Sequence, residues 1–231
     1  MTRGATARTG GAGAGAGKTR RLLAAALAGL LALLLWQVLS EGRLVALDEA
    51  LNRAFTPYRH GVALTAFVWL TDLGTGSTGV AVSLVASVLF WSGGRAGLIA
   101  PLWVTFLGAE AMTWAGKLLV GRVRPEFIEA ASAASPSFPS AHATVSVAVY
   151  GFLAYAACRG LADRRDRVLV RAGATVLIAL ICFSRLYLSL HYLGDVLAGA
   201  SVAGLWLLLG IRLAEGAGAA APRGTSDAAR R

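Results

Sequence analysis

Ser184-Arg185-Leu186-Tyr187-Leu188-Ser189-Leu190-His191-Tyr192-Leu193-Gly194-Asp195 sets an arginine, a histidine and an aspartate into an otherwise apolar part of the chain. Ionisable side chains are costly in such surroundings and usually serve a function, although a structural ion pair between two membrane helices remains the alternative. His191 and Asp195 are four residues apart, so on a helix the carboxylate can accept a hydrogen bond from the imidazole. Arg185 lies about 240° from His191 around a continuous helix. The two converge only if the chain turns within residues 186–190, and we predict that turn.

The composition is that of an integral membrane protein rather than of a soluble domain. The chain has 231 residues, of which 56% are hydrophobic and 15% are charged. Its net charge of +10 could suggest nucleic acid as a partner, but the basic residues are scattered between apolar segments instead of gathered on one face. We therefore expect membrane lipids as partners and no nucleic acid. The sequence does not indicate an oligomeric state.

Apolar segments of about the length of a bilayer recur along the chain. Six spans are predicted, at residues 22–39, 74–91, 97–119, 143–158, 168–183 and 192–213. Residues 44–73 mix charged and apolar side chains and suit an amphipathic helix in the membrane interface. Residues 1–21 and 214–231 are predicted as disordered cytoplasmic tails on either side of a membrane domain at 22–213. The predicted fold is an all-α polytopic membrane bundle of six transmembrane helices plus one interfacial helix.

The basic residues also predict how the chain is oriented. With six spans and the N-terminus inside, most of the 22 Lys and Arg residues fall on the cytoplasmic side. We therefore expect a multi-pass protein of the cell (plasma) membrane with both termini in the cytoplasm. The loop between the third and fourth spans and the turn after Arg185 then emerge together on the extracytoplasmic face.

That loop carries two further groups of polar residues. The first runs from Lys117 to Arg122, Arg124 and Pro125, and the second is Pro139-Ser140-Ala141-His142 at the start of an apolar run. Ser140 is typical of a helix N-cap, with Pro139 ahead of it. A helix N-terminus with a hydroxyl and nearby Lys and Arg side chains is suited to bind a phosphate group.

In order and spacing these three groups resemble the signature of the type 2 phosphatidic acid phosphatases (PAP2). This superfamily of lipid phosphate phosphatases also includes the vanadium haloperoxidases. The matching features are Lys117 with six residues before Arg124-Pro125, then Pro139-Ser140-x-His142, then Ser184-Arg185 with five residues before His191 and three more before Asp195. Ala141 stands where the family usually has glycine, which permits backbone angles and a close approach that alanine resists. We do not expect this substitution to inactivate the site.

The resemblance implies a role for each matching residue. His191 would attack phosphorus to form a phosphohistidine, Asp195 would orient its ring, and His142 would protonate the leaving oxygen and then activate water. Lys117, Arg124, Ser140 and Arg185 would hold the phosphate oxygens. The arrangement requires no metal and no cofactor. The sequence leaves open whether Arg122 contacts phosphate or only solvates the loop.

The predicted function is a membrane phosphatase that hydrolyses a phosphomonoester or diphosphate of a lipid. Phosphatidate, phosphatidylglycerophosphate and a polyprenyl diphosphate such as undecaprenyl diphosphate are not separated, because the signature describes only the phosphate. One alternative is a lipid-linked phosphoryl or headgroup transferase of the same fold. Another is a non-catalytic transporter or scaffold whose buried charges are structural. Haloperoxidase activity is disfavoured, since those relatives are soluble proteins.

Overall fold

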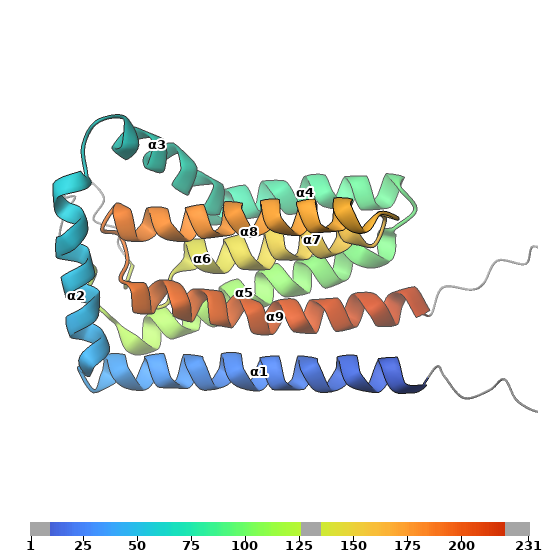
Figure 1. Ribbon diagram of the computed structural model, residues 1–231, viewed down its shortest axis with the longest axis horizontal. Helices are drawn as coiled ribbons and strands as arrows, with labels where there is room; N and C mark the ends of the chain where they lie inside the picture. The colour runs from blue at the N-terminus through green and yellow to red at the C-terminus, as the bar shows by residue number, and fades with distance from the viewer. Residues whose placement is uncertain (1–9, 126–134, 220–231) are drawn as a thin grey trace, which may run out of the picture.

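The computed structural model describes residues 10–125 and 135–219, and within these ranges the chain is helical and contains no strand. The long helices lie side by side along one axis, and the short helix α2 crosses one end of the bundle (Figure 1). The predicted all-α fold is confirmed. The helices along the axis are α1 (Gly10–Leu39), α4 (Gly76–Ser92), α5 (Ile99–Val120), α6 (Ala141–Val145), α7 (Gly151–Cys158), α8 (Arg164–Tyr187) and α9 (Leu193–Ala219).

Five helical segments are long and apolar enough to cross a membrane. They are Gly17–Leu39, Ala96–Val120, Ala141–Cys158, Arg164–Tyr187 and Leu193–Ala217. A sixth span exists if the bent pair Gly61–Gly74 and Gly76–Ser92, which meet at 55°, is one crossing. The upper count equals the six predicted spans, and the third of these segments contains a π-helical turn at Ser146–Tyr150, an irregularity that is frequent near functional sites.

The predicted single interfacial helix at 44–73 is wrong in extent, because the structure has two helices there. These are α2 (Arg43–Phe55) and α3 (Gly61–Thr71), joined by a short 3₁₀ turn at Thr56–Tyr58. Pro57 lacks a backbone donor, and Gly61 adopts a φ of 63°, so a continuous helix is broken at this point. Only α2 has the mixed character expected of an interfacial helix, since Asp48 is buried while Glu49 and Arg53 form an exposed pair.

Helices also extend into the predicted disordered tails. Helix α1 begins at Gly10 instead of residue 22, and α9 continues to Ala219 instead of ending at 213. Extending a formed helix costs little compared with starting one. The two extensions are joined by Arg20, which donates two hydrogen bonds of 2.5 and 2.6 Å to Glu215. The rest of the predicted tails, residues 1–9 and 220–231, lies outside the described residues.

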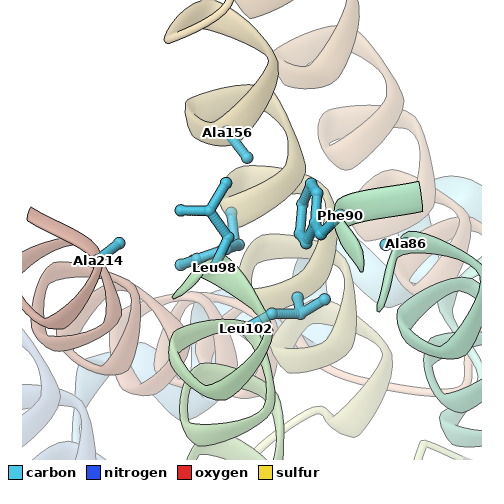
Figure 2. Packing of buried hydrophobic residues seen from close by; sticks show 7 residues of the cluster. Ala86, Phe90, Leu98, Leu102, Ala156 and Ala214 are labelled. Carbon is cyan, nitrogen blue, oxygen red and sulfur yellow. The ribbon is translucent and has the colours of Figure 1, made fainter. Parts of the chain in front are cut away.

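An apolar core fills the end of the bundle that is remote from α2. Figure 2 shows Ala86 and Phe90 of α4, Leu98 just before α5, Leu102 of α5, Ala156 of α7 and Ala214 of α9 gathered in this cluster. At the end of the bundle that α2 crosses, small residues let α9 approach its neighbours closely. An added Cβ at Gly199 would lie 2.4 Å from the carbonyl oxygen of Ser140. The start of α6 is therefore held directly against α9.

Candidate active site

All residues of the three motifs lie at the end of the bundle that α2 crosses. Helix α5 ends just after Lys117, α8 ends just after Arg185, and α6 and α9 begin near His142 and Asp195. The start of α1 and the end of α9 lie at the opposite end (Figure 1). Helix ends from distant parts of the sequence thus converge on one site.

The predicted turn between Arg185 and His191 is present. Helix α8 ends at Tyr187, α9 begins at Leu193, and Ser189 takes a left-handed φ of 55° between them. The backbone N–H of His191 donates to the carbonyl of Arg185 over 3.2 Å. The turn folds His191 back over the end of α8.

His191 is buried between a carboxylate and a guanidinium cation. Its Nδ1 lies 3.5 Å from Oδ2 of Asp195, longer than a hydrogen bond, and its Nε2 lies 3.1 Å from Nη1 of Arg124. Burial lowers the pKa of His191 to about 3; Asp195 opposes this shift, whereas the charges of Arg185 and Arg124 add to it. The ring is therefore neutral near pH 7. With its proton on Nδ1 facing Asp195, it presents the Nε2 lone pair beside Arg124.

Asp195 is fixed on both of its carboxylate oxygens. The backbone N–H of Tyr192 donates to Oδ2 over 2.9 Å, and Nη1 of Arg122 donates to Oδ1 over 2.7 Å. The backbone carbonyl of Asp195 accepts from the N–H of Ser140 over 2.9 Å, which joins the starts of α6 and α9. The carboxylate can therefore orient the His191 ring.

The role that the sequence left open for Arg122 has a structural answer. Its guanidinium bridges Asp195 and Asp48, with Nη2 2.9 Å from Oδ2 of Asp48, and it stacks over the Tyr192 ring at 4.2 Å. Asp48 also accepts from the backbone N–H of Gly194 over 3.0 Å. Arg122 is thus neutralised by two buried carboxylates and neither solvates the loop nor remains available as an uncompensated charge. Sequence reasoning missed Asp48, because nothing in its spacing connects α2 with α9.

Three other cations near the histidines donate to neutral oxygens instead. Lys117 donates to the carbonyl of Pro136, Arg124 to the carbonyls of Ser135 (2.9 Å) and Leu190 (2.7 Å), and Arg185 to the Thr71 hydroxyl (2.7 Å). In residues 10–125 and 135–219, no carboxylate lies within ion-pair distance of these three side chains. Burying unpaired cations is costly. The arrangement suits an anion that binds among them.

Several buried polar atoms at the site also lack a partner. Among the described residues, Oγ of Ser140, Nε of Arg185 and Nδ1 of His191 make no hydrogen bond. Ser140 occupies the N-cap position of α6 as predicted, but its hydroxyl does not cap the helix. Each of the first two atoms can donate to a bound oxygen.

His142 and Ala141 stand at the start of α6. His142 lies within electrostatic range of Lys117, Arg124, Arg185 and His191. Among the described non-glycine residues, Glu41 and Ser189 take a positive φ, and Ala141 does not. Alanine therefore fits the turn without the backbone strain that a glycine-only conformation would impose.

The fold and the site define a membrane protein built to receive an anion beside two histidines. The family model of the PAP2 superfamily matches residues 97–218, a range that contains all three motifs. Phosphatidylglycerophosphatase B of Bacillus subtilis is 29% identical over 160 residues, which cover 67% of this chain and 77% of that protein. The crystal structure of a transmembrane PAP2-type phosphatidylglycerolphosphate phosphatase from Bacillus subtilis aligns with a TM-score of 0.75 and 26% identity, and covers 84% of this chain and 96% of that one. The chain belongs to the PAP2 superfamily and is a membrane lipid phosphatase, which confirms the predicted family and enzyme class.

The bridge from Asp48 through Arg122 to Asp195 predicts an effect of α2 on activity. Asp48→Asn keeps the shape of the side chain but removes the charge that holds Arg122. Because residues that orient a catalytic group commonly contribute 10–100-fold, we expect kcat to fall by about tenfold with a smaller change in KM. Lipid phosphatase assays of purified protein in detergent measure both.

Glu49→Gln is the matched control, since this neighbour forms only an exposed pair with Arg53 at 3.6 Å. It should leave kcat unchanged. Equal kcat values for Asp48→Asn and the unmodified protein would show that Arg122 holds Asp195 without help from α2.

Proposed function

We propose that this phosphatase hydrolyses the phosphomonoester of phosphatidylglycerophosphate through a phosphohistidine on His191. The observation that carries the proposal is a set of three cations, the buried Lys117 and Arg185 and the partly buried Arg124, which lack carboxylate partners in the described part of the chain. The names of the two relatives support this substrate, because both refer to the phosphatase activity on phosphatidylglycerophosphate. Phosphatidate and polyprenyl diphosphates present a similar terminal phosphate and are the competing substrates.

In the first step, the lone pair on Nε2 of His191 attacks phosphorus and forms a P–N bond. The P–O bond to the lipid breaks, and the leaving oxygen takes a proton from His142. Asp195 keeps the ring oriented and compensates the positive charge that develops on it. The products of this step are the lipid alcohol and a phosphorylated His191.

In the second step, His142 accepts a proton from water as the water oxygen attacks phosphorus. The P–N bond breaks, inorganic phosphate leaves, and His191 returns to its neutral form. Throughout both steps, Lys117, Arg124 and Arg185 would stabilise the charge on the equatorial oxygens. Ser140 Oγ and Arg185 Nε, which lack partners among the described residues, would donate to the same oxygens.

The substrate assignment predicts the outcome of an assay across a panel of lipids. Purified protein in detergent should release inorganic phosphate faster from phosphatidylglycerophosphate than from phosphatidate or a polyprenyl diphosphate. Because side-chain cations meet the charge on the phosphate, EDTA should not inhibit. Vanadate, which adopts the geometry of five-coordinate phosphorus, should inhibit.

His191→Ala should reduce phosphate release to background, whereas His60→Ala, at an exposed histidine before α3, should not change it. Retained turnover in His191→Ala or loss of activity in EDTA would refute this mechanism. Phosphate transferred to added glycerol in preference to water would instead favour the transferase alternative. Faster release from another lipid of the panel would reassign the substrate without changing the mechanism.

We infer that the site opens on the extracytoplasmic face of the plasma membrane, with both termini in the cytoplasm. Two observations support this orientation. Most of the basic residues fall on the side of the termini in a six-span topology. The site lies at the end of the bundle opposite the start of α1 and the end of α9 (Figure 1).

Cysteine labelling in intact cells tests this orientation. In a variant that lacks the free cysteines Cys158 and Cys182, a thiol reagent that cannot cross the membrane should label Ser40→Cys and not Ala162→Cys. Both positions are exposed, and they lie in the α1–α2 and α7–α8 connections at opposite ends of the bundle. The reverse pattern of labelling would place the chemistry in the cytoplasm.

A further inference from the structure

A cavity lies between α7, α8 and α9, at the end of the bundle remote from the active site. Its volume is about 540 Å³, within the range of small-molecule sites. Arg159, Arg167 and Arg171 line one part of it, and the lining continues along α8 to Ile178. Small residues, Ala154 on α7 and Ala174 on α8, also line it. The cavity is therefore cationic at one end and largely apolar along its length.

Two arginines of this cavity, Arg167 and Arg171, form no ion pair with any acid of the described residues. Arg167 and Arg171 are one helical turn apart and repel each other. Across the described ranges, neither has a carboxylate within ion-pair distance. Arg159 donates to the Tyr155 hydroxyl over 2.9 Å, and the nearby Glu215 is already bonded twice to Arg20. Within the described residues, the cavity thus has an excess of positive charge at this end.

The length of the cavity matches a lipid better than a soluble anion. Arg167 and Ile178 are separated by about 16 Å along α8 at 1.5 Å per residue. Helix α8 is a candidate membrane span over Arg164–Tyr187, so its first turns lie at the membrane boundary and Ile178 lies deeper. A phosphate would use only the arginines, and a purely apolar ligand would leave them unpaired.

We propose that this cavity binds an anionic phospholipid. Its headgroup phosphate would lie among Arg159, Arg167 and Arg171, and one acyl chain would follow α8 towards Ile178. Basic pockets between transmembrane helices are known to recognise anionic lipid headgroups. The lipid is a ligand here and not a substrate, because the catalytic histidines lie at the other end of the bundle (Figure 1). A ligand that binds only the folded protein raises its stability.

Native mass spectrometry and thermal unfolding of the purified full chain in detergent test the proposal. Phosphatidylserine, which carries no phosphomonoester, should give bound adducts and a higher unfolding midpoint than phosphatidylcholine. In the double variant Arg167→Gln/Arg171→Gln, the amount of bound phosphatidylserine should fall at least about fivefold, since two of three charge-assisted contacts are removed. Most of the rise in the unfolding midpoint should also be lost. The matched control Arg164→Gln/Arg165→Gln, at exposed positions of the same helix outside the cavity, should behave like the unmodified protein.

A second variant separates lost binding from misfolding. Ala174→Phe keeps every arginine and fills the apolar part of the cavity, so it should also reduce phosphatidylserine adducts. Phosphatase activity in detergent should stay within about twofold in both variants, because the catalytic end of the bundle is untouched. Unchanged adducts in both variants would overturn the proposal. An equal loss of adduct in the control pair would also overturn it, by indicating an effect of general surface charge. Equal binding of phosphatidylcholine would indicate an apolar groove, and an equal rise of the unfolding midpoint with inorganic phosphate would indicate a soluble-anion site; either result would overturn the proposal.

Discussion

The site depends on one constraint: Lys117 and Arg185, which are buried, and Arg124, which is partly buried, form no ion pair with any acid of the described residues. Each cation comes from a different helix end or loop, and each is held by neutral oxygens of Thr71 or of backbone carbonyls. Neutral oxygens orient a cation but do not cancel its charge. The free energy stored in this way is recovered when an anion binds, and most strongly when that anion gains charge in a transition state.

Arg122 shows how the same chain treats a cation with a different task. It lies two residues before Arg124, yet it is held by the carboxylates of Asp48 and Asp195. Its charge is therefore used to fix Asp195 in place, and through Asp48 it connects α2 to the start of α9. Two arginines of one motif thus have different positions: Arg122 holds the carboxylate of Asp195, and Arg124 lies beside His191.

Sequence patterns predicted the parts of this protein that depend on local spacing. The separation of Arg185, His191 and Asp195 predicted a turn, and the structure has that turn at Ser189. The break between α2 and α3 could have been predicted from Pro57 and Gly61, which the mixed composition of residues 44–73 obscured. Asp48 could not have been predicted, because its contacts with Arg122 and Gly194 depend on how distant helices pack. Helix ends at Gly10 and Ala219 were also missed, since Gly/Ala-rich composition does not reveal a helix that is extended from a membrane span.

We propose that the cationic site positions the phosphate for attack by His191. Rapid-quench labelling with radiolabelled phosphatidylglycerophosphate is the sharpest test, because it would trap the proposed phosphohistidine. We expect an acid-labile, base-stable phosphoenzyme that forms in the unmodified protein, persists longer in His142→Ala with a good leaving group, and is absent in His191→Ala. An undiminished amount of phosphoenzyme in His191→Ala would show that His191 is not the residue that carries the phosphate.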